Sequence, residues 1–301
     1  MNLLLARKKI EEFLNEDIGT GDLSTDLTFT ETDVDEGVFL AKQDGVICGT
    51  FIPNIVYDIL GGEAHFTPSI KDGDTVKSGD IIGTAKGSVR TLLTGERVIL
   101  NLMQRMGAIA TITAKSIAEL NDTKIRICDT RKTAPGLRLF DKYAVTQGGG
   151  YNHRVGLYDG VMLKDNHIAY AGGIEKAVKK VRDQIGQMVK IEVEVESLDE
   201  VKQAVNANAD VIMFDNRSPQ EVSEFMKFIP SHIVTEVSGG INLDNINSYS
   251  GCGADYISIG FLTHSVTALD ISFNNIEKMK NILNDNDNTK DGKSSNIKGE
   301  D

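Results

Sequence analysis

The sequence CDTRKTAPGLRLFDKYAVTQGGGYNHRVGLYDGVMLKDNHI, residues 128–168, gathers cationic side chains around three consecutive glycines. These side chains are Arg131, Lys132, Arg138, Lys142, His153, Arg154, Lys164 and His167. The chain as a whole carries a formal net charge of −12, so a local excess of cations adds nothing to its general solubility. Such a cluster instead creates a local field for an anion. The stretch therefore predicts a site for a ligand with several negative charges.

A solvated surface is the alternative explanation, and for any single Lys or Arg it is the better one. Here the charges are interleaved with turn-forming residues, namely Pro135-Gly136 and the glycines at 148–150. They also flank the apolar residues 161–163, which predict a buried strand that ends at Lys164. Charges at strand ends beside tight turns converge more often than charges along a helix face.

Short apolar runs recur after this stretch and predict a parallel sheet or barrel. They occupy residues 161–163, 191–195, 211–214, 233–237 and 256–259, with helical patterns between them. This alternation is typical of repeated βα units. Two helix starts are also predicted, because Ser197 precedes Glu200 and Ser218 precedes Glu221 at the spacing of a capping box. The second has Pro219 at the favoured first helical position.

The N-terminal part has a different pattern. Residues 3–15 have helical spacing, residues 38–89 contain short β-like runs between turns, and residues 91–118 are mostly helical. We therefore expect an α/β protein, an open parallel α/β barrel with an α+β N-terminal domain. The expected boundaries are 1–108 for the first domain and 109–266 for the barrel, with a C-terminal helix at 267–284 that completes the first domain. The polar residues 285–301 are expected to be a disordered tail.

Composition excludes several classes of protein. With 301 residues, 40% hydrophobic and 25% charged, the chain is ordinary for a soluble globular protein. Its apolar runs fall short of the roughly 18 to 20 residues that cross a bilayer, and we expect neither a membrane span nor a cleaved leader. Its three scattered cysteines favour a reducing, cytoplasmic setting. A sequence pI near 5.0 and the lack of a basic stripe argue against nucleic acid as a partner.

Glutamates alternate with valines in IEVEVES, so that Glu192, Glu194 and Glu196 would share one face of a strand. A half-exposed antiparallel strand is the commoner explanation of such a pattern. In a βα repeat, however, the strand is covered on both faces. Acids there need polar partners, which an inward-facing site with cations and a metal supplies.

Polar and glycine residues follow the later strands. Asp215 ends its run where barrel enzymes place catalytic groups, although a helix-capping aspartate explains it as well. Ser238-Gly239-Gly240 and Ser258-Ile259-Gly260 end the next two runs. Glycine turns after the last strands of a barrel leave backbone N–H groups free to hold a phosphate.

The ordered series TRKTAPGLR, DKYAV and GGGYNHRVGLYDGVMLKDNHI resembles the quinolinate phosphoribosyltransferase family. A weaker resemblance extends over residues 16–265. It implies transfer of phosphoribose to quinolinate with decarboxylation, giving nicotinate mononucleotide, pyrophosphate and CO2 in NAD biosynthesis. It also implies phosphoribosyl pyrophosphate as co-substrate, Mg²⁺ as cofactor, and a homodimer whose sites are shared between subunits, with a higher homo-oligomer as the alternative.

The same resemblance implies roles for individual residues. The substrate-binding residues are Arg97, Thr130, Arg131, Lys132, His153, Arg154 and Lys164. The phosphate-binding residues are Ser238, Gly239, Gly240, Ser258, Ile259, Gly260 and His264. The catalytic residues are Glu194, Asp215, Lys132 and Lys164, with Glu194 and Asp215 also as metal ligands. Arg97 would reach into the neighbouring subunit's site, while Arg138 and Lys142 are expected to be structural or peripheral.

Three other functions are compatible with parts of this pattern. A phosphoribosyltransferase for another aromatic acid would have a similar site. A non-catalytic anion-binding protein on the same scaffold would gain from losing acids near its ligand, so the presence of both Glu194 and Asp215 argues against it. A related group associated with molybdenum-transport gene clusters shares the fold but has a PHR-like tripeptide. Asn152-His153-Arg154 and the KDNH run at 164–167 favour the NAD-pathway enzyme.

Overall fold

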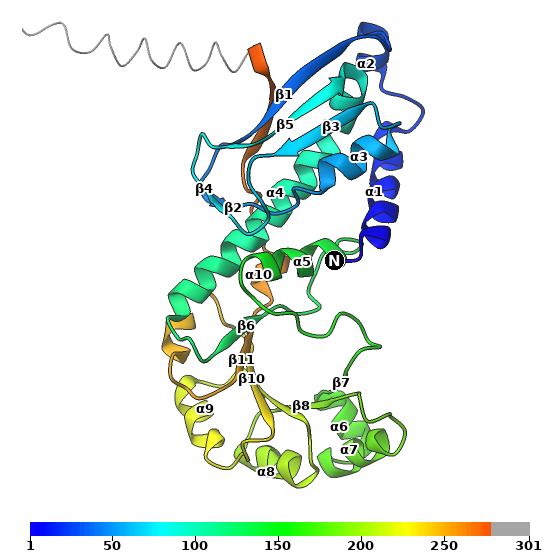
Figure 1. Ribbon diagram of the computed structural model, residues 1–301. Coiled ribbons are helices and arrows are strands. Elements are labelled where there is room, and N and C mark those ends of the chain that lie inside the picture. Colours follow the sequence, from blue (N-terminus) through cyan, green and yellow to red (C-terminus); the bar gives the residue numbers. More distant parts are fainter. Residues whose placement is uncertain (278–301) are drawn as a thin grey trace, which may run out of the picture. The chain divides into compact units, whose positions relative to one another are not determined.

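The computed structural model describes residues 1–277, which form two compact units (Figure 1). The first unit comprises Met1–Gly107 and the described residues from Ala268 onward, and the second comprises Ala108–Thr267. The long helix α4 (Val89–Leu120) contributes residues to both units. No helix among the described residues is both long enough and apolar enough to cross a membrane.

The first unit is an antiparallel sheet with helices. Its four-stranded sheet has the order β12-β1-β5-β3, and a separate pair joins β2 to β4. The strands are β1 (Val34–Ala41), β2 (Gly45–Val46), β3 (Ala64–Pro68), β4 (Thr75–Val76), β5 (Ile81–Ser88) and β12 (Ile271–Asn275). The helices are α1 (Leu3–Ile18), α2 (Leu23–Thr28), α3 (Ile52–Ile59) and the first part of α4.

The helix α3 departs from the sequence pattern, which predicts short strands and turns over residues 38–89. Its sequence IPNIVYDI has Pro53 in the first turn, where proline is tolerated because the N–H it lacks would have no partner. Ile52 and Val56 lie one turn apart and are both fully buried. Two apolar residues four positions apart are too short a pattern to distinguish a helix from a strand in the sequence.

The C-terminal helix predicted from residue 267 was wrong over its first part. Residues 271–275 are strand β12, which pairs antiparallel with β1, so that Phe273 lies opposite Phe39. The ring of Phe273 packs 4.6 Å from that of Phe39 between centroids, and a Cβ on Gly37 would lie 2.2 Å from it. The pairing with the edge of β1 and the packing of the half-buried Phe273 ring on Phe39 and Gly37 outweigh the local helical pattern. The remainder of the predicted helix, after residue 277, and the predicted tail at 285–301 lie outside the described residues.

The second unit is built on a six-stranded parallel sheet with the order β6-β11-β10-β9-β8-β7. Its strands are β6 (Arg126–Cys128), β7 (Val161–Leu163), β8 (Ile191–Val195), β9 (Val211–Asp215), β10 (Val234–Ser238) and β11 (Tyr256–Ser258). β6 and β7 are consecutive in the chain but lie at opposite edges of the sheet. The sheet is therefore an open barrel, and residues 129–160 connect its two edges.

Helices alternate with these strands, as the sequence predicts. They are α5 (Arg138–Gln147), α6 (Asp165–Ala171), α7 (Ile174–Arg182), α8 (Leu198–Asn206), α9 (Pro219–Met226), the short 3-10 helix η1 (Ile246–Tyr249) and α10 (Phe261–His264). Both predicted capping boxes are present. Ser197 accepts from the Glu200 amide and Ser218 from the Glu221 amide, each at 3.3 Å. These caps start α8 and α9 soon after β8 and β9 end. Because the strands are parallel, their carboxyl ends lie along the same edge of the sheet.

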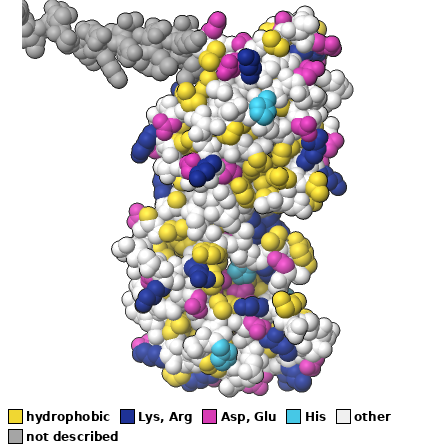
Figure 2. Space-filling model, in the orientation of Figure 1, with side chains coloured by type: hydrophobic (Ala, Val, Ile, Leu, Met, Phe, Trp, Pro, Cys, Tyr) yellow, Lys and Arg dark blue, Asp and Glu magenta, His cyan; other side chains and the backbone are white. Residues whose placement is uncertain are grey.

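The apolar core of this unit lies between the sheet and its helices. Ile191, Val193 and Val195 of β8 belong to it and are at most 1% exposed. Because side chains alternate along a strand, Glu192 and Glu194 point to the other face, the barrel interior. Glu196 lies after the end of β8 and is exposed, so the third acid of IEVEVES does not join them. On the face drawn in Figure 2, basic and acidic side chains are interspersed, without a continuous basic stripe.

Candidate active site

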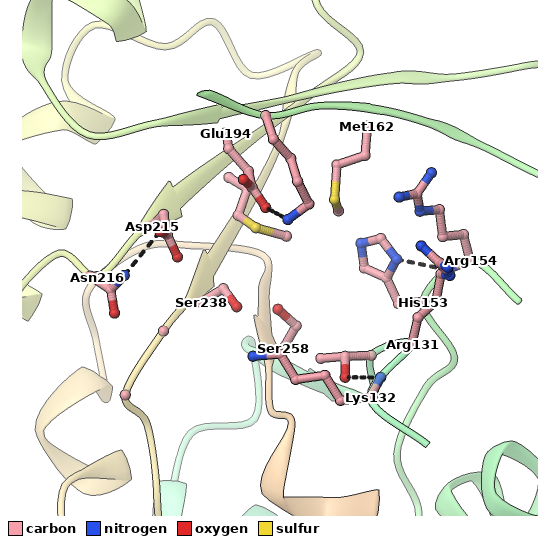
Figure 3. A pocket seen from close by; sticks show the side chains of 15 residues that line it. Arg131, Lys132, His153, Arg154, Met162, Glu194, Asp215, Asn216, Ser238 and Ser258 are labelled. Atoms are coloured by element: carbon pink, nitrogen blue, oxygen red, sulfur yellow. Dashed lines mark hydrogen bonds and ion pairs between the residues drawn. The ribbon is translucent and has the colours of Figure 1, made fainter. Parts of the chain in front are cut away.

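A cavity of about 590 Å³ opens at the carboxyl ends of the parallel strands (Figure 3). It is lined by Thr130, Arg131, Lys132, His153, Arg154, Met162, Lys164, Glu194, Met213, Asp215, Asn216, Ser238, Gly239, Gly240 and Ser258. Carboxyl ends of parallel strands are where ligands bind in α/β proteins. Most of the residues selected from the sequence therefore meet in one place, although they come from the strands β8 to β11, the segment between β6 and β7, and Lys164 just after β7.

Glu194 and Asp215 lie apart from the arginines of this cavity, and Lys164 is the cation on their side. In Figure 3, Glu194 and Asp215 lie on one side, and Arg131, His153 and Arg154 lie on the other. Lys164 donates a hydrogen bond to Oε1 of Glu194, whose side chain is 16% exposed. Burial raises the pKa of Glu194, and the hydrogen bond from Lys164 opposes this shift. The site thus separates a region suited to carboxylates from a region suited to a cation or hydroxyl groups.

On the cationic side, Arg131 has an unsatisfied hydrogen-bond donor. Its Nε is buried and has no hydrogen-bond partner among the described residues. Arg154 donates from Nη1 to the carbonyl oxygen of Gly160 at 2.9 Å, which fixes its side chain at the cavity wall. An unpaired buried guanidinium N–H is costly, and a carboxylate can accept from it. The observation points to an anionic ligand beside Arg131.

His153 is held from both ring nitrogens. Its Nδ1 accepts from the Arg154 amide at 2.7 Å, while its Nε2 lies 3.0 Å from Glu192 Oε2 and 3.5 Å from Glu236 Oε2. Burial by itself lowers the pKa of His153, but the hydrogen bond to Glu192 and the charges of Glu236 and Glu192 outweigh it and raise the pKa. His153 lines the cavity as predicted. Its nitrogens, however, already have partners within the protein.

His153, Glu192 and Glu236 also have the composition of a metal site, with ligand atoms that all lie within 4.8 Å of one another. The hydrogen bond from the Arg154 amide requires a lone pair on Nδ1. In the neutral ring the proton is then on Nε2, which makes that nitrogen a donor to the two carboxyl groups and not a metal ligand. The arrangement is a hydrogen-bonded cluster inside the barrel.

Models of known families match most of the chain. The model for the quinolinate phosphoribosyl transferase N-terminal domain matches residues 22–107, and that for its C-terminal domain matches residues 109–274. The chain belongs to the quinolinate phosphoribosyltransferase family.

Individual relatives in this family agree with the models. The probable nicotinate-nucleotide pyrophosphorylase [carboxylating] of Bacillus subtilis is 49% identical over 272 residues, which cover 90% of this chain and 94% of the relative. The chloroplastic nicotinate-nucleotide pyrophosphorylase [carboxylating] of Arabidopsis thaliana is 40% identical, over 86% of this chain and 79% of the relative. Among solved structures, NadC from Streptococcus pyogenes has a TM-score of 0.88 at 40% identity, over 91% of this chain and 96% of that chain.

The glycine turns that the family resemblance assigns to phosphate lie partly at the cavity. Ser238, Gly239 and Gly240 line it, and the two glycines have φ of 92° and 64°, which favours glycine. Ser258 lines it as well. The predicted residues Ile259, Gly260 and His264 are not among its lining residues. Ile259 is buried, and a Cβ on Gly260 would lie 3.0 Å from Lys132 and 3.2 Å from His264.

Arg97, predicted to complete the site of a neighbouring subunit in this family, belongs to α4 in the first unit. It is not among the residues that line the cavity. Its role therefore depends on a second copy of the chain and stays a prediction.

Sequence reasoning missed Asn216 and Glu236. Asn216 lines the cavity and donates from Nδ2 to Oδ2 of Asp215 at 2.9 Å. Glu236 lies on β10 and is 4% exposed, and its burial raises its pKa to about 8. A glutamate inside the apolar run IVTEV was the available signal, because a charged residue there must face either solvent or a polar interior.

Proposed function

We propose that this chain transfers the phosphoribosyl group of phosphoribosyl pyrophosphate to the ring nitrogen of quinolinate, with loss of one carboxyl group as CO2. The products are nicotinate mononucleotide, pyrophosphate and CO2, in the biosynthesis of NAD. The observation that carries the proposal is the division of the cavity into a cationic side with an unpaired buried Arg131 N–H and an acidic side with Glu194 and Asp215. Quinolinate fits the first side, and the ribose and its leaving group fit the second.

The chemistry requires two bonds to break. The ring nitrogen attacks C1 of the ribose as the bond from C1 to the pyrophosphate oxygen breaks, and pyrophosphate leaves. The bond from ring C2 to its carboxylate then breaks, the electron pair stays on C2, and C2 takes up a proton. Carboxylates beside C1 stabilise the positive charge that develops on the ribose. We assign this role to Glu194 and Asp215.

The cations have separate tasks in this proposal. Arg131 and Arg154 hold the two carboxylates of quinolinate, because a guanidinium binds a carboxylate through two parallel hydrogen bonds. The His153 side chain forms part of the cavity wall, and behind it lie the buried Glu192 and Glu236. Lys132 and Lys164 face the diphosphate, and the Thr130 hydroxyl accepts from the backbone N–H of Lys132 at 3.0 Å. The turns at Ser238–Gly240 and Ser258–Gly260, with His264, are assigned to the 5-phosphate.

Mg²⁺ is proposed as the cofactor. Glu194 and Asp215 offer hard oxygen ligands at the same cavity wall, and Mg²⁺ is commonly held by one or two carboxylates together with substrate phosphates. Bound there, the ion would neutralise charge on the leaving diphosphate. The donor set of the chain fits such an ion, with Lys164 as the cation that pairs with Glu194 when the diphosphate is absent.

The assembly and location are also proposed. We infer a homodimer in which Arg97 of each chain completes the site of the other, with a higher homo-oligomer as the alternative. Cys48, Cys128 and Cys252 are unpaired and buried, which agrees with a reducing compartment and a cytoplasmic location.

The test is direct. The purified protein is incubated with carboxyl-labelled quinolinate, phosphoribosyl pyrophosphate and Mg²⁺, and both the mononucleotide and labelled CO2 are measured. Equal amounts of the two products are expected. A parallel incubation with nicotinate and other aromatic acids tests the alternative substrate. Binding of quinolinate without any product under any metal condition would support the non-catalytic alternative and overturn the proposal.

A further inference from the structure

Asn216 follows the last residue of β9 and connects two parts of the cavity that come from different strands. Its Nδ2 donates to Oδ2 of Asp215 at 2.9 Å, and its backbone N–H donates to the carbonyl oxygen of Ser238, the last residue of β10, at 2.9 Å. Figure 3 shows the amide of Asn216 beside Asp215, at the edge of the cavity. One residue therefore contacts both the proposed catalytic acid and the start of the proposed phosphate turn.

The side chain of Asn216 also covers this turn. A Cβ on Gly239 would lie 2.2 Å from Oδ1 of Asn216 and 2.9 Å from its backbone nitrogen. Any residue larger than glycine at position 239 would displace the amide from Asp215. The shape of the turn and the orientation of the amide thus depend on each other.

The backbone of Asn216 is unusual as well. Its φ is 53°, in the left-handed region, where only Asn121 and Asn208 join it among the non-glycine residues of the described part. Asparagine tolerates this conformation better than most residues with a side chain. The position therefore requires a residue that accepts the left-handed backbone and that also has a short side chain with an N–H donor. Asparagine meets both requirements, whereas glycine meets only the first.

We propose that Asn216 is a positioning residue for phosphoribosyl pyrophosphate, which fixes the carboxylate of Asp215 and the Ser238–Gly240 turn in one arrangement. This inference rests on the proposed function. The amide holds Oδ2 of Asp215 and leaves Oδ1 for the ribose or its metal ion. Without the amide, the carboxylate is free to rotate and the turn loses the side chain that packs against it. Both changes affect the ribose phosphate and neither touches the cations assigned to quinolinate.

Two substitutions separate the side chain from the backbone. Asn216→Gly removes the amide but accepts φ of 53° without strain, whereas Asn216→Ala removes the amide and strains the backbone. Asn208 is the matched control, because it is exposed, has φ of 54° and does not line the cavity. Asn208→Gly and Asn208→Ala repeat the same backbone changes away from the site.

The variants are compared by steady-state kinetics, by calorimetric titration with phosphoribosyl pyrophosphate and with quinolinate alone, and by thermal unfolding. For Asn216→Gly and Asn216→Ala, we expect kcat/KM for phosphoribosyl pyrophosphate to fall by about 10- to 100-fold, as for other residues that orient a ligand-binding group. The Kd for phosphoribosyl pyrophosphate should rise, and the Kd for quinolinate should not change. Asn216→Ala should also have a lower unfolding temperature than Asn216→Gly. The difference between these two temperatures should equal the difference between the two Asn208 variants.

Each outcome decides one question. If the wild-type protein makes no mononucleotide, the proposed function is wrong. If the wild type is active and Asn216→Gly has the same kcat/KM for phosphoribosyl pyrophosphate, the Asn216 side chain does not position Asp215. Equal weakening of both ligands in Asn216→Gly would indicate a general structural role, which also overturns the inference.

Discussion

The ammonium of Lys142 lies 2.5 Å from Oδ1 of Asp129, at a place where the two side chains are 4% and 0% exposed. The same oxygen accepts from the backbone N–H of His153 at 2.9 Å, and Lys142 donates to the carbonyl oxygen of His153 at 2.9 Å. The pair therefore holds both backbone groups of a residue in the cavity wall. Burial raises the pKa of Asp129 to about 6, although Lys142 opposes the shift.

Lys142→Met should destabilise the protein strongly, because it leaves Asp129 buried without its cation. Loss of one partner of a buried ion pair costs about 3 to 5 kcal/mol in the free energy of unfolding. The exposed pair of Lys179 and Asp183, at 77% and 61% exposure, gives the control. Lys179→Met should change the free energy of unfolding by at most about 0.5 kcal/mol. Urea denaturation of both variants measures the difference, and similar small losses would show that the buried pair contributes little.

Glu194→Gln and Asp215→Asn should each lower kcat by about a hundredfold or more, which is typical for loss of one electrostatic stabiliser of a transition state. Folding should survive, since both replacements are nearly isosteric. Glu196→Gln, at an exposed position just after β8, is the control and should leave kcat unchanged. An unaltered rate in either of the first two variants would return that residue to a structural role.

Glu236→Gln should change how stability depends on pH. The pKa of Glu236 is raised to about 8 by burial and by the charge of Glu192, although the charge of His153 opposes the shift. Between the unfolded pKa near 4.3 and pH 8, the folded protein keeps a proton that the unfolded chain has lost, so the stability of the wild type falls as pH rises. The slope is at most about 1.4 kcal/mol per pH unit.

The position does not titrate in Glu236→Gln, so this variant should lose less stability across that window. Thermal unfolding of both proteins at several pH values from 5 to 9 measures the difference, since the other titrating groups are common to both. Parallel curves for the two proteins would mean that Glu236 titrates as an ordinary exposed acid.

Arg97 tests the proposed homodimer. If it completes the partner's site, dimers of an Arg97→Ala chain and a Glu194→Gln chain have one intact site and one site with both lesions. With random mixing, half of the dimers are mixed, so roughly a quarter of wild-type activity should return although each variant alone is nearly inactive. No recovery after subunit exchange would mean that Arg97 acts within its own chain or has no role in the site.

Quinolinate should be strongly preferred over nicotinate. Nicotinate has one carboxylate, so part of the cationic side with Arg131 and Arg154 would be desolvated without a counter-charge, which costs about 2 to 5 kcal/mol. The value of kcat/KM should therefore be lower for nicotinate by a factor of about thirty to several thousand. Phthalate, which keeps two adjacent carboxylates but lacks the attacking nitrogen, should inhibit competitively and much more strongly than benzoate. Equal inhibition by phthalate and benzoate would be incompatible with a site for two carboxylates.

Local signals in the sequence determined the strands β7 to β11, the starts of α8 and α9, and the acid at the end of β9. The apolar runs at 191–195 and 211–214 correspond to β8 and β9, and the capping boxes at Ser197 and Ser218 are present. These features depend on contacts within a few residues, so periodicity and spacing report them directly. The resemblance of residues 128–168 to the family then predicts which of the side chains in this stretch bind substrate.

Tertiary structure alone decided which distant residues meet. His153 lies beside the end of β6, where its backbone N–H donates to Asp129, and it contacts Glu236 because β6 and β10 lie in one sheet with only β11 between them. No local pattern contains this order. Likewise, residues 271–275 form a strand because the edge of β1 is available to pair with them. Asn216 joins Asp215 to the Ser238 turn through the register of β9 and β10. Such pairings follow from strand order and register, which are set by packing of the whole barrel and not by the residues on either side.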